Sequence, residues 1–230
     1  MKQSGKYIRV SYDLGSSMPV FSGNPPNRVD KVDCFEKGAA WNSSLLTLFN
    51  HNGSHIDAPN HFDPGGKKIC DYTVDDFIYT NPCLVDVPKG EGECITAADL
   101  AEVGKRDCDI LLIRTGYSLM RKDESYVENN PWLEPGAADF IRRNFTKLRA
   151  IGIDTVSIAS CRHPVEGGDA HRILLREGDY VGGPVMIIED LNLGILPDRI
   201  KRFYAIPLFA CDVDSMPCTA FAEIENHERR

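Results

Sequence analysis

The sequence has no excess of positive charge. Its 34 acidic residues outnumber the 26 basic ones, which gives a formal net charge of −8 at pH 7. Proteins that bind a phosphate backbone need a stripe of Lys and Arg side chains, and no segment of this chain supplies one. The charge balance therefore opposes nucleic-acid binding.

Long apolar runs and paired cysteines are missing as well. No stretch approaches the ~20 apolar residues of a membrane span, and Met1 to Val10 is too polar and basic for a secretory signal. None of the eight cysteines forms a Cys-x-x-Cys pair, so we expect free thiols rather than disulfides or a cysteine metal site. These absences predict a cytoplasmic protein with no membrane partner.

What is present is an ordinary globular composition, with 42% hydrophobic and 26% charged residues over 230 positions. That length is enough for a full apolar core. Strand-like and helix-like segments alternate, with extra strands early and late, which favours a single α/β domain with a mixed β-sheet over residues 1–230. Strands are expected at 45–49, 83–87, 109–114, 150–160 and 185–189, with one or two more within 203–213.

Local signals predict the helices and loops. Thr96-Ala-Ala-Asp99 has the form of a capping box and predicts a short helix to about Val103. Apolar spacing predicts a second helix over 136–148, and Asp169 is placed to cap a third that ends near Gly178. Segments 15–31 and 60–68, which are rich in Gly, Pro and polar residues, are expected to be loops.

The most informative stretch is 51–62, which reads His-Asn-Gly-Ser-His-Ile-Asp-Ala-Pro-Asn-His-Phe and holds three of the six histidines. In an extended strand, side chains at positions i, i+4 and i+6 project from one face, so His51, His55 and Asp57 would converge. Gly53 falls on the same face and would leave room for an ion or a substrate. Two imidazoles and a carboxylate suit Zn²⁺, Mn²⁺ or Fe²⁺, so the segment predicts a metal site.

His61 follows a turn after Pro59. Its spacing fits a fourth ligand, a group that supports the ligands, or a general acid/base, and all three roles stay open on spacing alone. The competing interpretation of the whole segment is a solvated loop of polar residues.

One strand supplies only part of a coordination shell, so further ligands are expected downstream. His171 would lie in the first turn of the predicted third helix and could point into a cleft. Glu189 ends an apolar strand, where a buried carboxylate needs a cation or a partner. His163 precedes a proline in a loop and is expected not to be a ligand. Other acidic candidates are Glu166, Asp169 and Glu177.

These residues together resemble a known family. The motif His51-x-Gly-Ser-His55-x-Asp57-x-Pro-x-His61-Phe is similar to the signature of the cyclase family, which includes bacterial kynurenine formamidase (arylformamidase) and isatin hydrolase. Weaker segments occur in the expected order and extend the resemblance over nearly the whole chain. These segments are 13–23, 111–116, 152–157, 170–175 and 189–193.

The resemblance implies a β/β/α fold of the swivelling type, assembled as a homodimer or homotetramer. It also implies that His51, His55 and Asp57 bind one divalent ion, zinc or alternatively manganese. Asp57 would bridge to a second ion held with His171 and Glu189.

Two further roles follow from the resemblance, together with two departures from the family pattern. His61 would donate and accept protons. Phe21 would contact an aromatic substrate, at a position where the formamidases tend to have a tryptophan. Residues 179–184 look like an insertion between His171 and Glu189, and residues 161–164 form an unusual Cys-Arg-His-Pro loop near the site.

The predicted function is a metal-dependent hydrolase that cleaves an amide or cyclic acyl bond in a small molecule, such as N-formylkynurenine or isatin. Metal-activated water would attack the carbonyl, with His61 as general acid/base. One alternative is a non-haem iron oxygenase that uses His55, Asp57 and His171. The other is a non-catalytic metal-binding protein, although structural zinc sites are usually closed and rich in Cys and His.

Overall fold

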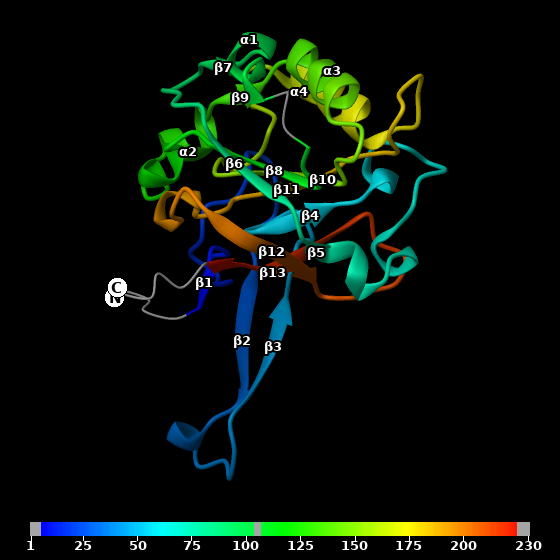
Figure 1. The fold of residues 1–230 in the computed structure, drawn as a ribbon. Helices are drawn as coiled ribbons and strands as arrows, with labels where there is room; N and C mark the ends of the chain where they lie inside the picture. Colours follow the sequence, from blue (N-terminus) through cyan, green and yellow to red (C-terminus); the bar gives the residue numbers. More distant parts are fainter. Residues whose placement is uncertain (1–5, 104–106, 225–230) are drawn as a thin grey trace, which may run out of the picture.

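A mixed β-sheet forms the centre of the molecule (Figure 1). The structure is a computed structural model and describes residues 6–103 and 107–224. The first five residues, part of the segment expected to lack a secretory signal, are outside the described residues. In the described ranges the sheet has nine strands in the order β5-β12-β13-β4-β11-β10-β8-β6, and β1 pairs with β13. Their bounds are β1 Tyr7–Arg9, β4 His55–Asp57, β5 Ile78–Tyr79, β6 Pro82–Asp86, β8 Ile110–Arg114, β10 Ala150–Ile153, β11 Met186–Glu189, β12 Ile200–Pro207 and β13 Ser215–Ile224.

The two halves of this sheet differ in strand direction. β6, β8, β10 and β11 are parallel, and their near-continuous apolar sequences fit strands covered on both faces. β4 pairs antiparallel with β11 on one side and with β13 on the other, and the remaining strands are also antiparallel. The predicted α/β class with a mixed sheet is therefore confirmed.

Helices cover one face of the parallel half, where α3 and α4 pack against it (Figure 1). A second apolar cluster contains side chains of both halves, such as Leu112 of β8 and Phe203 of β12, so it lies inside the curved sheet. The helices are α1 Ala97–Leu100, α2 Ser125–Glu128, α3 Pro135–Asn144 and α4 Pro164–Leu175. Among the described helices, none is long and apolar enough to cross a membrane.

Two short sheets lie outside the central one. β7 Cys94–Ile95 pairs with β9 Trp132–Leu133. β2 Arg28–Asp33 and β3 Ser43–Thr47 form an antiparallel ribbon that projects from the body (Figure 1). The strand expected at 45–49 is present as β3, but it starts and ends two residues earlier, and it pairs with β2 in the ribbon and does not continue into the histidine segment.

Most other elements follow the sequence signals, with corrected ends. The capping box at Thr96 is present, although α1 ends at Leu100 and not near Val103. The strand expected over 150–160 stops at Ile153, because the chain turns where the Asp154 carboxylate accepts hydrogen bonds from the Thr115 and Gly116 amides. The loop expected over 15–31 ends where β2 begins, and β13 lies beyond the range predicted for the last strands.

Candidate metal centre

Three adjacent central strands bring the acidic and imidazole side chains together. β4 lies between β11 and β13, with His55 opposite Glu189 in β11 and Asp57 opposite Ser215 in β13. His55 and Asp57 alternate with buried Ile56, so both project from the same face of β4. The sheet register therefore sets Glu189 beside the two β4 residues although it is more than 130 positions away in sequence.

His51 reaches the cluster from a turn and not from the strand. β4 begins only at His55, and Gly53 in the preceding turn has a φ of +73°, which favours glycine. A Cβ at Gly53 would lie 2.6 Å from Met18 Cε and 3.0 Å from Leu14 Cδ2. The prediction that one strand face carries His51, His55 and Asp57 is therefore wrong. Gly53 was expected to leave room for an ion, but its role is to permit the turn.

Four side chains nevertheless converge around Asp57. Its Oδ1 lies 2.9 Å from His51 Nδ1 and 3.4 Å from His55 Nε2, and its Oδ2 lies 3.9 Å from His171 Nε2. Glu189 approaches from the other side, with Oε2 3.4 Å from His55 Nε2 and Oε1 3.6 Å from His171 Nε2.

Two groups of possible metal ligands share Asp57 within the described part of the chain. One contains His51, Asp57 and His61, and the other contains His55, Asp57 and Glu189. In each group, one ligand atom per residue lies within 4.8 Å of the others. This grouping differs from the expected one, in which His51 and His55 share an ion and Glu189 joins His171. In both the expected and the observed grouping, Asp57 is the residue that the two ligand groups share.

Each imidazole that contacts Asp57 is anchored through its other ring nitrogen. The bonded pairs are His55 Nδ1 with Gly53 O at 2.7 Å, His171 Nδ1 with Gly167 O at 2.8 Å, and His51 Nε2 with Asp214 Oδ2 at 3.0 Å. Carbonyl and carboxylate oxygens only accept, so the anchored nitrogens carry hydrogen. In a neutral ring, the nitrogen that faces the cluster then has a free lone pair, as a metal ligand requires.

The Asp57 carboxylate is the strongest indication of a cation. The residue is 1% exposed, and neither of its oxygens has a hydrogen bond of acceptable geometry, although imidazole nitrogens approach it. Burial opposes its ionisation, but the positive charges of His51 and His55 hold its pKa well below the usual range. Burial likewise acts to lower the pKa of His51, and Asp57 and Asp214 overcome it and raise that pKa to about 10. A buried anion with free oxygens fits a divalent cation.

Glu189 is held by the segment that follows β10. Its Oε1 accepts hydrogen bonds from Ser157 Oγ at 2.9 Å and from the Ile158 amide at 2.7 Å. Burial acts to raise its pKa, but hydrogen bonds with His171 and His55 lower it to about 2. The carboxylate is therefore ionised, and Glu189 lies in the cluster although residues 179–184 stand between it and His171 in sequence.

Helix α4 positions His171 differently from the prediction. The helix begins at Pro164 and not at Asp169, so His171 is the eighth helical residue and not part of the first turn. A Cβ at Gly167 would lie 2.5 Å from Ala159 Cβ, which shows how closely the helix approaches the 157–160 segment. His163 stacks on Trp132 with ring centroids 4.6 Å apart and belongs to neither ligand group of the described residues.

A cavity of about 390 Å³ opens onto the cluster and is bordered by His61. Phe21 lines it, as predicted for a residue near the substrate, and also packs against Tyr117, Tyr126 and Val156. The lining does not include the acidic candidates Glu166, Asp169 and Glu177, as far as the described residues go. Its apolar members are Phe21, Phe62, Val156, Ala159, Cys161 and Pro164.

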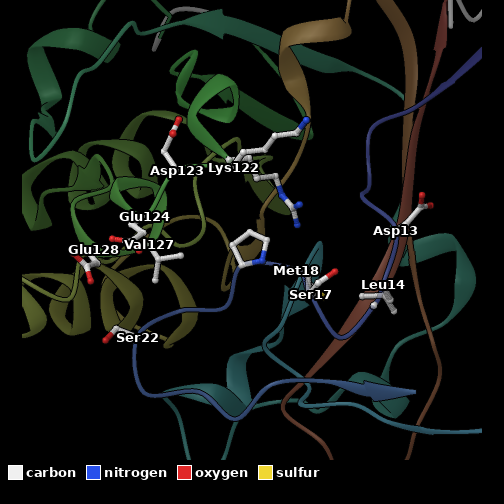
Figure 2. A pocket seen from close by; sticks show the side chains of 13 residues that line it. Asp13, Leu14, Ser17, Met18, Ser22, Lys122, Asp123, Glu124, Val127 and Glu128 are labelled. Atoms are coloured by element: carbon white, nitrogen blue, oxygen red, sulfur yellow. The ribbon is translucent and has the colours of Figure 1, made fainter. Parts of the chain in front are cut away.

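A larger cavity of about 760 Å³ adjoins the first one, and Ser22 lines both. In Figure 2, Asp13 and Leu14 lie on one side of this cavity, and Glu124, Val127 and Glu128 lie on the other, with Ser22 below them. Many of these side chains are charged. The lining includes Asp13, Lys122, Asp123, Glu124 and Glu128.

Asp214 is a further residue of the site, and the sequence gives no signal for it. Its Oδ2 lies 2.8 Å from His61 Nδ1 as well as 3.0 Å from His51 Nε2. The residue directly precedes β13, and nothing in the surrounding Asp-Val-Asp-Ser sequence separates it from the other acidic residues of the chain.

Comparison with known proteins gives consistent matches over the chain. Residues 8–160 match the sequence profile of the family described as "Putative cyclase". A kynurenine formamidase from Bacillus cereus is 28% identical over 228 residues, covering 95% of this chain and 97% of the relative.

Solved structures agree in fold. Isatin hydrolase A from Labrenzia aggregata, bound to benzyl benzoate, superposes with a TM-score of 0.79 at 22% identity, covering 96% of this chain and 94% of that one. A structure described as a "potential metal-dependent hydrolase with cyclase activity" gives a TM-score of 0.73 at 24% identity, with coverages of 96% and 98%.

Proposed function

The chain belongs to the cyclase family, and from this we propose that it is a metal-dependent hydrolase of a small-molecule amide or cyclic acyl compound. The formamidase and isatin hydrolase relatives bear out the expected enzyme class, which is hydrolysis of a C–N bond other than a peptide bond. The observation that carries the proposal is the buried Asp57 carboxylate, which has imidazole nitrogens directed at it and no hydrogen bond of its own.

The residues of the cluster fit one or two divalent ions. We propose that His51, His55 and Asp57 would hold one ion, and that Asp57, His171 and Glu189 would hold a second, although the side-chain distances also place His61 near the first set and His55 near the second. Zn²⁺ suits this mixture of imidazole and carboxylate donors, with Mn²⁺ as the alternative. When bound, a divalent ion polarises a carbonyl oxygen and lowers the pKa of water.

His61 is the proposed acid/base. It lines the cavity, and its ring lies 4.2 Å from that of His51, next to the point where a substrate carbonyl would meet the cluster. One ring nitrogen is hydrogen-bonded to Asp214, which leaves Nε2 to take a proton from the attacking water and return it to the leaving nitrogen.

The cavity supports a flat aromatic or cyclic amide as substrate. Its volume of about 390 Å³ suits a small molecule, and aromatic and aliphatic side chains form much of its wall. In this proposal Phe21 contacts the aromatic ring of an aryl formamide such as N-formylkynurenine, or of a cyclic amide such as isatin.

The experiment that tests this proposal has two stages. Purified protein is analysed for bound Zn and Mn, and is then assayed with that metal on N-formylkynurenine, isatin and cyclic imides. We expect hydrolysis that a chelator abolishes and that proceeds equally well without dioxygen, which excludes the iron oxygenase alternative. Stoichiometric metal without turnover of any of these compounds would contradict the proposed substrate class and favour a non-catalytic metal protein.

We further propose a cytoplasmic homodimer that contacts its partner copy through the β2–β3 ribbon. Two-stranded ribbons are marginal in water on their own. This one projects from the body (Figure 1) and exposes large apolar side chains. Trp41 and Leu45 are 62% and 58% exposed, and Val29 pairs with Leu46 across the strands. A projecting element of this kind can pack on the same element of a second copy about a two-fold axis.

The proposed location in the cytoplasm is supported by the cysteines. All eight are free thiols, as is usual for proteins of a reducing compartment.

A further inference from the structure

We propose that Asp214 is a positioning residue that determines which ring nitrogen carries hydrogen in both His61 and His51. This inference rests on the proposed function, in which His61 moves protons and His51 binds metal. Asp214 Oδ2 is 2.8 Å from His61 Nδ1 and 3.0 Å from His51 Nε2, so one oxygen serves both rings.

Asp214 is itself held by residues that precede and follow β4. Its Oδ1 accepts a hydrogen bond of 2.8 Å from Asn50 Nδ2, and its backbone carbonyl accepts one of 2.8 Å from the Ala58 amide. The next residue, Ser215, is paired with Asp57 in the β13–β4 register. Asp214 is therefore attached to the strand that carries the metal cluster, and its position cannot change without moving β4 or β13.

The chemistry of the acceptor determines the tautomers. An ionised carboxylate has no hydrogen to donate, so His61 Nδ1 and His51 Nε2 must both be N–H groups. In the neutral rings the lone pairs then lie on His61 Nε2 and His51 Nδ1. His51 Nδ1 is the atom 2.9 Å from Asp57 Oδ1, where a cation would be bound, and His61 Nε2 is left free to act as a base.

Because Asp214 Oδ2 contacts both rings, Asp214 affects both metal binding by His51 and proton transfer by His61. An acceptor behind a ligating histidine fixes its ring and raises its basicity, and loss of such a partner costs about 10- to 100-fold in affinity or activity. A carboxylate that acted only by stabilising the fold would contribute to the free energy of unfolding and would leave the tautomer of His61 unchanged.

The test compares Asp214→Asn with Asp212→Asn, a matched change two residues earlier at a side chain that is 87% exposed and paired with Lys68. We expect Asp214→Asn to lower kcat by about 10- to 100-fold with little change in KM, and to weaken metal affinity within the same range. Asp212→Asn should alter neither. In the His61→Ala background, assayed at saturating metal so that weaker metal affinity has no effect, Asp214→Asn should give no further loss of kcat, because its effect on turnover of the metal-loaded enzyme passes through His61.

Long-range ¹H–¹⁵N NMR spectra of the histidines give a readout that does not depend on activity. In the parent protein, at a pH where the ring is neutral, His61 should be in the Nδ1–H form, and Asp214→Asn should abolish that preference. An unchanged His61 tautomer in this variant, or a full additional loss of kcat in the double variant, would overturn the inference.

The spectra also separate this inference from the proposed function. If the parent protein hydrolyses none of the tested amides but the tautomer depends on Asp214, the proposed function fails and the positioning role stands. If Asp214→Asn does not fold, Asn50→Ala removes the bond to Oδ1 while keeping the carboxylate. A carboxylate that has lost this bond is held less firmly against His61 Nδ1, so a smaller shift of the His61 tautomer in the same direction is then expected, and its absence counts against the inference.

Discussion

Each imidazole around Asp57 has two ring nitrogens with different partners, and this division decides what the side chain can do. The outward nitrogens of His55 and His171 donate to the backbone carbonyls of Gly53 and Gly167. Because the backbone holds these rings, their inward nitrogens already point at the carboxylates. The ligands are therefore preorganised by hydrogen bonds formed outside the cluster.

Replacing His61 by alanine tests the separation of proton transfer from metal binding. We expect His61→Ala to keep its metal and to lose about 10²- to 10⁴-fold in kcat, the usual contribution of a positioned acid/base. Metal content by elemental analysis and kcat on a turned-over amide are the measurements. His163→Ala is the control, because His163 stacks on Trp132 and lies outside both ligand groups of the described residues. Turnover at the parent rate in His61→Ala would remove His61 from the mechanism.

At the residue scale, the sequence predicted which side chains of the 51–62 segment belong to the cluster. It did not predict the backbone conformation that brings them together. The spacing within 51–62 identified the histidines and Asp57, but it assumed an extended strand where the chain makes a turn with a left-handed Gly53. Asp214 could not be identified, since its role depends on the pairing of β13 with β4, and short sequence patterns carry no information on such long-range pairing.

The packing of helix α4 against the 157–160 segment fixes the position of His171 in the site. It carries Gly167 and His171 one turn apart, and Gly167 lies against Ala159, close to the Ser157 and Ile158 groups that hold Glu189. A change in the distance between the helix and this segment therefore moves His171 relative to Glu189.

Two adjacent glycines of α4 give a matched pair of variants. In Gly167→Ala the new Cβ would lie 2.5 Å from Ala159 Cβ, so we expect about 1–3 kcal/mol of lost stability together with weaker metal binding. In Gly168→Ala the nearest atom is the flexible tip of Arg172 at 3.4 Å, so the better helix propensity of alanine should raise stability by up to about 1 kcal/mol. Denaturant unfolding and metal titration measure both effects. If the two variants changed equally in stability and in metal affinity, the close contact between Gly167 and Ala159 would have no role in positioning His171.

Elements with strong local signals were predicted well. The apolar runs of β8 and β11 and the capping box at Thr96 specify their own structure. The start of α4 was misplaced because Pro164 at the first helical position competed with Asp169 as a start signal, and the proline marks the true start.

For the molecule as a whole, a bound metal should contribute directly to stability. A ligand that binds only the folded state stabilises it by about 2.7 kcal/mol at 100 times its Kd. For a chain of this size that corresponds to a rise in Tm of roughly 5–10 °C. Thermal unfolding of chelator-treated protein, with and without added Zn²⁺ or Mn²⁺, measures the shift. Asp57→Asn is the control, and added metal should raise its Tm much less than it raises the Tm of the parent protein. A parent Tm that is independent of metal would contradict a metal site in this cluster.

The proposed dimer gives a second prediction at this scale. Changing Leu45 and Leu46 to lysine places two charges on the exposed β2–β3 ribbon, and we expect the mass measured by light scattering to fall from that of a dimer to that of a monomer. Leu119→Lys introduces a charge at an apolar side chain that is 85% exposed and lies outside the ribbon, and it should leave the mass unchanged. A parent protein that is monomeric at all concentrations would contradict the assignment of the ribbon to self-association.

The position of the ligands on three neighbouring strands also has a kinetic consequence. His55, Glu189 and the Asp214 loop meet only after β4 has paired with both β11 and β13, contacts that close very long loops of chain. A cation that needs all of these strands would find no complete site in a partly folded chain. We therefore expect added metal to slow the unfolding rate and to leave the refolding rate nearly unchanged, as stopped-flow chevron plots with and without metal can show.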